Sequence, residues 1–151
     1  MPSLYLWLKF FHIAGLGVFL LGHGVSAGSS LMLRRASADA IRAALLRLSI
    51  QANFAAFPGL LLVLVTGVWM GFVGHWWRAG WIWAAIVTLV AVMVVMSAMS
   101  VPYHKARDSA NAKPPAEDLT IVLKPARPLE LAVVGAIGLL ILFFLMVFKP
   151  F

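Results

Sequence analysis

The sequence predicts an all-α fold, an integral membrane four-helix bundle, from its composition and from the length of its apolar stretches. Of the 151 residues, 63% are hydrophobic and only 11% are charged, and the mean hydropathy is +0.98. A soluble domain of this size cannot bury so much apolar surface. Each apolar stretch approaches the ~20 residues that an α-helix needs to cross the hydrocarbon core. We therefore expect a single membrane domain, residues 1–151, in a lipid bilayer.

The expected membrane helices have apolar centres and identifiable ends. The first is long enough to tilt or to extend beyond the bilayer, and its two histidines favour a retained helix over a cleaved signal peptide. Pro58 lies close to the start of the second helix, and Pro128 and Glu130 suit the first turn of the fourth. The expected helices are residues 4–33, 54–73, 81–101 and 129–148.

The connections between these helices differ in character. Residues 34–50 have the apolar periodicity of an amphipathic lead-in to the second helix, and residues 74–80 are short and aromatic (GHWWRAG). Residues 102–127 are rich in proline and charge, so we expect a cytoplasmic loop with little regular structure.

The distribution of basic residues predicts the orientation in the membrane. Nine of the 12 Lys and Arg residues lie in the first and third connections, and three lie on the opposite side. Because cytoplasmic loops carry the excess of Lys and Arg, we expect a multi-pass protein of the bacterial inner membrane with periplasmic N- and C-termini. An aromatic belt at the outer interface agrees with this orientation, and it comprises Trp7, Trp76, Trp77, Trp81 and Trp83.

Composition also excludes several classes of function. The chain has no cysteine, which excludes disulfides, thiolate metal sites, iron–sulfur clusters and covalently attached haem. The net charge of +7 comes from loops between apolar stretches, so nucleic-acid binding is not expected. Hydrolytic and phosphoryl-transfer chemistry lack the Ser/His/Asp sets, glycine loops or paired carboxylates that they need.

Two histidines, His12 and His23, lie within the first expected helix. Eleven residues at about 100° each bring them to within roughly 20° of one helical face, ~16 Å apart along the axis. Ionisable groups at membrane depth normally face protein, a cofactor or a water-filled cavity, so we expect this face to carry the function. It also carries Tyr5, Lys9, Ser26 and Ser30.

Three interpretations of the two histidines are open. In the first, each imidazole hydrogen-bonds a hydroxyl on another helix, with Ser97, Ser100 or Thr88 as the partner. In the second, one or both imidazoles ligate haem b or a metal. In the third, they relay protons.

Depth along the helices, at 1.5 Å per residue, suggests partners for the second interpretation. His12 near the outer rim pairs with His75. His23, deeper in the membrane, pairs with His104 or, at a closer depth, with Met99, and Met96 lies one turn shallower.

The outer site is the more favourable one for haem b. Lys9 and Arg78 supply cations for the propionates, and the neighbouring tryptophans supply flat rings for the macrocycle. We therefore predict that His12 is a haem ligand with His75 as its partner. The alternative for Lys9 is that it snorkels to the headgroups.

A row of methionines, Met93, Met96 and Met99, recurs every three residues on the third expected helix. Thioethers bind Cu(I), so the candidate metal ligands are His12, His23, Met96 and Met99. The alternative is that these methionines fill irregular packing space.

Gly17, Gly24 and Gly28 fall on the face of the first helix opposite the histidines. The Gly24-xxx-Gly28 spacing lets helix backbones approach closely. We expect the first helix to be packed on both sides, either at the centre of the bundle or against a second copy of the chain.

The opening LYLWLKFFHIAG, with Lys9 and His12 in a Lys-x-x-His pattern, resembles that of a superfamily of small bacterial four-helix membrane proteins. It includes the CopD-like copper-resistance proteins, the HemJ-type protoporphyrinogen oxidases and integral membrane proteins of uncharacterised function. Further matches are Pro58 and Gly67 in FPGLLLVLVTG, and Pro102 closing the third helix. The resemblance implies a b-type haem or copper, with His12 as a ligand or site residue.

The chain departs from the HemJ-type proteins after this opening. Their Trp-Ala-Gly and Leu-Pro-Arg-Leu motifs are replaced by GLGVFLLGHGVSAGSSLMLRR. We therefore do not expect protoporphyrinogen oxidase activity, and the uncharacterised branch of the superfamily is nearest.

The leading hypothesis is a membrane b-type haem protein that transfers electrons within the bilayer. Its expected partners are a quinone or a redox protein, and it acts as a homodimer or as a subunit of a larger membrane complex. The alternatives are a copper-handling membrane protein and a non-catalytic scaffold or assembly subunit.

Overall fold

The computed structural model describes residues 3–111 and 119–151, and the regular structure in these ranges is helical. Four of the helices are long and apolar enough to cross a membrane, which confirms the predicted all-α four-helix membrane bundle. The elements are α1 (Leu4–Leu33), α2 (Asp39–Val73), η1 (Trp76–Arg78), α3 (Gly80–Asn111), α4 (Leu119–Leu123) and α5 (Pro128–Phe148).

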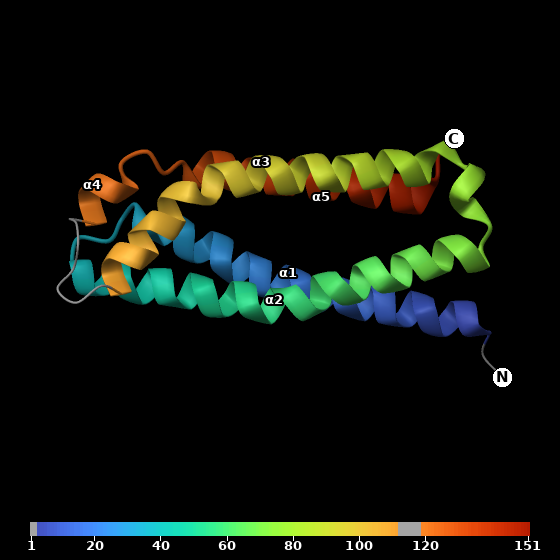
Figure 1. Ribbon diagram of the computed structural model, residues 1–151, viewed down its shortest axis with the longest axis horizontal. Helices are drawn as coiled ribbons and strands as arrows, with labels where there is room; N and C mark the ends of the chain where they lie inside the picture. The colour runs from blue at the N-terminus through green and yellow to red at the C-terminus, as the bar shows by residue number, and fades with distance from the viewer. Residues whose placement is uncertain (1–2, 112–118) are drawn as a thin grey trace.

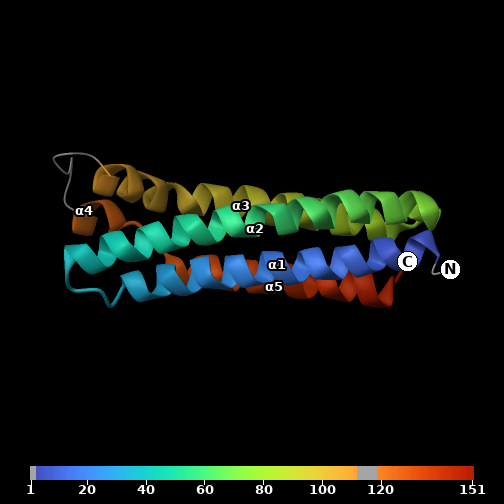
Figure 2. The same ribbon diagram turned by 90° about the horizontal axis from the view of Figure 1, so that it is seen from below.

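The membrane helices are arranged as two antiparallel pairs. Helix α1 packs along α2, and α3 packs along α5, and the two pairs lie in two layers with α1 over α5 and α2 over α3 (Figures 1 and 2). One end of the bundle, the terminal end, holds the start of α1, η1 and Phe151. The opposite end, the loop end, holds the α1–α2 connection and α4.

The α1–α2 contact is a seam of small residues. A Cβ atom added at Gly59 would lie 2.7 Å from the Gly15 carbonyl oxygen, and one added at Gly22 would lie 2.6 Å from the Ala52 carbonyl oxygen. The two backbones therefore touch, as small residues allow in membrane helix pairs. Buried positions seven residues apart form the seam: Leu8, Gly15, Gly22 and Ser29 on α1, and Ala52, Gly59 and Thr66 on α2.

The prediction that Gly17, Gly24 and Gly28 pack against another part of the bundle is wrong. A Cβ atom at any of the three would meet nothing within 4 Å in the described residues. This face is turned away from α2, because the α2 backbone packs against Gly15 and Gly22 on the opposite side of α1. Contact with a second copy of the chain stays a prediction.

Apolar clusters hold the two ends of the bundle together. At the loop end, Leu33, Leu46 and Tyr103 pack with Ala106 and Leu119 and so join α1, α2, α3 and α4. At the terminal end, α3 and α5 share a second cluster, and Gly71 on α2 approaches Ile82 on α3. The second cluster consists of Trp81, Ile82, Ala85 and Leu145.

Two helices extend further than predicted. Helix α2 begins at Asp39, so the amphipathic lead-in and the membrane helix are continuous through Pro58. Helix α3 continues through Pro102 to Asn111, and the short α4 covers Leu119–Leu123. Both helices lie where a loop with little regular structure was expected over residues 102–127, so this expectation is corrected there. A proline removes one backbone hydrogen bond, and burial of Tyr103 and Ala106 at the loop end offsets this loss. The part of the expected loop at residues 112–118 lies outside the described residues.

Tryptophan side chains gather at the terminal end, as the expected belt requires. The rings of Trp76 and Trp81 are 5.4 Å apart, and those of Trp77 and Trp83 are 5.8 Å apart. The ammonium of Lys149 lies 4.0 Å from the centre of the Trp76 ring, a cation–π contact that holds the end of α5 against η1. Trp7 packs separately, on phenylalanines of α1.

Candidate functional site

His12 is half-buried on α1 and faces α2. Its Nδ1 atom lies 3.1 Å from Oγ1 of Thr66, which is only 4% exposed. The Thr66 hydroxyl also lies within hydrogen-bond distance of two backbone carbonyl oxygens, 2.5 Å from that of Leu62 and 3.3 Å from that of Val63. With its hydrogen given to Leu62, the shortest of these contacts, Thr66 accepts from Nδ1–H of His12, and Nε2 then carries the free lone pair.

A glycine makes room for this imidazole. A Cβ atom added at Gly67 would lie 3.1 Å from Cε1 of His12, closer than an ordinary van der Waals contact. The Nδ1–Cε1 edge of the ring is thus packed against α2, through the hydrogen bond to Thr66 and the close approach of Gly67. Both contacts come from successive residues, Thr66 and Gly67, on one turn of α2.

The prediction that His12 hydrogen-bonds a hydroxyl on the third helix is wrong. The partner is Thr66, because α1 packs along α2 and the neighbouring hydroxyl on that helix is the one within reach. Ser100 instead donates to the Ser97 carbonyl oxygen and bonds Nε2 of His104 on its own helix.

The other residues of the predicted outer site lie at the terminal end. His75 is exposed and has a left-handed backbone conformation, with φ 54°, between α2 and η1. Lys9 and Arg78 are also exposed. Tyr5 meets Trp76 edge-on at 5.8 Å, which brings α1 beside η1. Among the described residues no contact joins His12 to His75, so their pairing stays a prediction.

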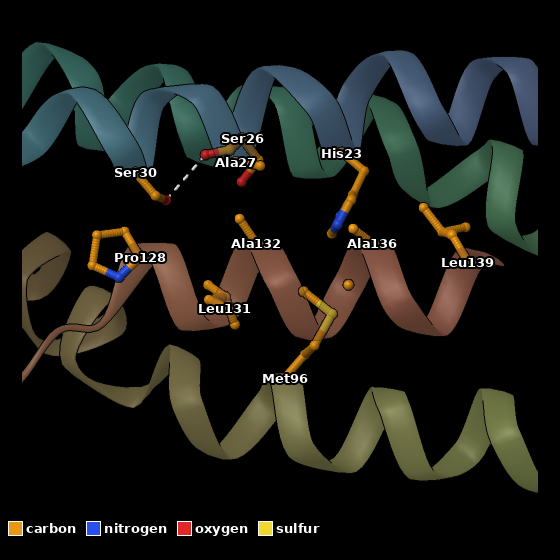
Figure 3. A pocket seen from close by; sticks show the side chains of 11 residues that line it. His23, Ser26, Ala27, Ser30, Met96, Pro128, Leu131, Ala132, Ala136 and Leu139 are labelled. Carbon is orange, nitrogen blue, oxygen red and sulfur yellow. Dashed lines mark hydrogen bonds between the residues drawn. The ribbon is translucent and has the colours of Figure 1, made fainter. Parts of the chain in front are cut away.

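His23 lines a cavity of about 190 Å³ between α1 and α5. Its ring stacks on Phe19 at 5.3 Å, and it points toward α5 (Figure 3). A Cβ atom added at Gly135 would lie 3.5 Å from Nε2 of His23. The lining residues are His23, Ser26, Ala27, Ser30, Met96, Pro128, Leu131, Ala132, Gly135, Ala136 and Leu139.

The residues predicted to join His23 are placed differently. Met96, rather than Met99, lines the cavity, and its Sδ atom would lie 3.6 Å from a Cβ atom at Gly135. His104 is exposed and contacts Ser100 and Arg107 on its own helix. Depth along ideal helices had favoured Met99, which lies about one turn further along α3 than Met96.

The described residues do not bring metal-ligating side chains together in a cluster. Within residues 3–111 and 119–151 no group of three or more His, Cys, Asp or Glu side chains could hold a metal ion. The donors that remain are individual imidazoles and the Met96 thioether.

Fold and site together define a multi-pass membrane protein with two histidines on the inward side of its first helix. The chain belongs to the family described as "Predicted integral membrane protein (DUF2269)", whose model matches residues 6–150. No curated protein and no solved structure matches the chain.

Proposed function

We propose that this protein binds a b-type haem through Nε2 of His12 and transfers electrons within the membrane. The observation that carries this proposal is the hydrogen-bonded chain from His12 through Thr66 to the Leu62 carbonyl. Histidines that ligate metals almost always donate their other ring N–H to an acceptor, which sets the tautomer and the ring orientation.

The hydrogen bonding of His12 is that of a histidine that could hold haem iron. Its Nδ1 is paired with Thr66 on α2, so Nε2 is the ring nitrogen that we assign to the iron. A free imidazole nitrogen held in one orientation is the usual proximal ligand of haem iron. Bound haem would supply one-electron chemistry, and the protein would supply orientation and an apolar surrounding.

The surroundings favour the His12 end over the His23 cavity. The cavity at His23, about 190 Å³, is smaller than the ~300–1,000 Å³ of pockets that enclose drug-sized ligands. At the terminal end, Lys9 and Arg78 carry charges that suit propionates, and the tryptophan rings suit a macrocycle edge. His75 is the second ligand that we propose there.

The partners and the location follow from the same reasoning. An electron carrier in the bilayer exchanges electrons with a quinone or with a redox protein. The resemblance of the Lys9–His12 segment to the CopD-like and HemJ-type superfamily supports haem or copper chemistry. The excess of Lys and Arg at the loop end supports a cytoplasmic loop end and periplasmic termini in a bacterial inner membrane.

Haemin titration into the haem-free protein in lipid nanodiscs tests the ligand assignment. We expect a Soret band with the wild type, none with His12→Ala, and about 10–100-fold weaker binding with Thr66→Val, because the orienting acceptor is lost. His104→Ala is the matched control, since it removes an exposed imidazole at the other end. Equal haemin binding by wild type and His12→Ala would contradict the proposal.

A further inference from the structure

The cavity beside His23 runs from the charged loop end into the membrane. Its lining extends along α5 from Pro128 to Leu139, which corresponds to ~16 Å of helix. Pro128 directly follows the exposed Arg127, and Ser30 lies one turn before Arg34 on α1. One end of the cavity is therefore at the loop end, and His23 lies deeper.

The polar groups of the cavity that can bond water lie on its α1 side. His23, Ser26 and Ser30 lie on that side, and small or apolar residues such as Ala132 lie on the α5 side (Figure 3). The Ser26 hydroxyl also bonds the Ser49 hydroxyl on α2 at 2.8 Å. A volume of about 190 Å³ has room for about six waters at ~30 Å³ each. Ser30 donates its hydrogen to the Ser26 carbonyl oxygen, so its lone pairs remain free to accept hydrogen bonds from water.

His23 needs a partner that the described residues do not supply. None of them hydrogen-bonds its imidazole, which stacks on the ring of Phe19. An imidazole left without hydrogen bonds in a membrane costs several kcal/mol. Water in the cavity removes this cost, since it can both donate and accept.

No other titratable group faces His23 from the helices around the cavity. Among the lining residues of α1, α3 and α5, His23 is the one ionisable side chain. The charged groups nearest the cavity along these helices are Arg34, Arg127 and Glu130, at the loop end, where Arg127 and Glu130 form an exposed ion pair at 3.2 Å. Within the cavity, a proton that enters from the loop end therefore has His23 as its one titratable acceptor among the lining side chains.

We propose that this cavity is a water-filled crevice through which protons from the loop end reach His23, a proton-binding group within the membrane. The proton comes from water or buffer on that side and adds to the free ring nitrogen, which gives the imidazolium. A metal is the weaker interpretation, because His23 and Met96 supply two donors and most metal sites take more. The proposal is independent of haem at His12.

Cysteine accessibility tests the crevice, because the chain has no native cysteine. Single variants Ala27→Cys and His23→Cys face the cavity, whereas Gly28→Cys, beside Ala27, would meet nothing within 4 Å. A charged methanethiosulfonate reagent added at the loop end should modify the two cavity variants about tenfold faster than Gly28→Cys, since only a hydrated thiol forms the reactive thiolate. Equal rates, or faster reaction from the terminal end, would overturn the crevice.

Nitrogen-15 NMR of the full chain in nanodiscs tests proton binding itself. The His23 signal, assigned by its loss in His23→Phe, should move to the imidazolium position as the pH falls from 8 to about 5, spanning the ordinary histidine range. A signal that stays at the neutral position would overturn the proposal. Stoichiometric Cu(I) binding that is lost in both His23→Phe and Met96→Leu would overturn it in favour of a metal site.

Discussion

The Nδ1 atom of His12 lies 3.1 Å from Oγ1 of Thr66, and this hydrogen bond crosses the seam between α1 and α2. The Thr66 hydroxyl makes its shortest contact, 2.5 Å, with the Leu62 carbonyl oxygen, an arrangement in which it accepts the Nδ1–H of His12. In that arrangement one buried hydroxyl sets the tautomer of His12 and leaves Nε2 for a ligand.

We predict that Thr66→Val destabilises the protein. Valine has nearly the same shape but no acceptor, so Nδ1–H of His12 loses its partner, at a cost of about 1–3 kcal/mol in the free energy of unfolding. Thr66→Ser keeps the hydroxyl and is the control. Unfolding by sodium dodecyl sulfate in mixed micelles measures the difference, and equal stability of the two variants would refute the role assigned to this hydroxyl.

We predict that Gly59→Ala disrupts the α1–α2 seam. The added Cβ would lie 2.5 Å from the Phe19 backbone nitrogen, so the helices must separate, at about 1–3 kcal/mol. Gly24→Ala is the control, because its Cβ would meet nothing within 4 Å. If Gly24→Ala were the more destabilising change, the open face of α1 would be an interface with a second copy.

We predict that the loop end faces the cytoplasm. Ser37→Cys, in the α1–α2 connection, should react with an impermeant maleimide only in inside-out vesicles, because the Lys and Arg excess lies on that side. Arg78→Cys in η1 should react only in right-side-out vesicles. The reverse pattern would overturn the orientation.

Hydropathy was sufficient to predict the helices, because about twenty consecutive apolar residues have few alternatives to a membrane helix. The inward direction of His23 was also predictable, since a polar face must turn away from lipid. The end of α3 was not predictable from Pro102, because the burial of Tyr103 and Ala106 depends on α1, α2 and α4.

The packing face of α1 was predicted wrongly because two sets of glycines share one helix. Gly24 and Gly28 have the familiar four-residue spacing, whereas Gly15 and Gly22 are seven apart and make the contact. A matching seven-residue spacing on α2, ending at Thr66, was present in the sequence as a signal. Recognising that signal would also have pointed to Thr66, rather than to hydroxyls on α3, as the partner of His12.

The most direct test of His12 as a haem ligand is the absorption spectrum of the protein purified from haem-replete cells, before and after dithionite. We predict a Soret band that shifts on reduction in the wild type and in His104→Ala, and its loss in His12→Ala. A colourless wild-type protein, or a His12→Ala protein with an unchanged spectrum, would contradict the assignment.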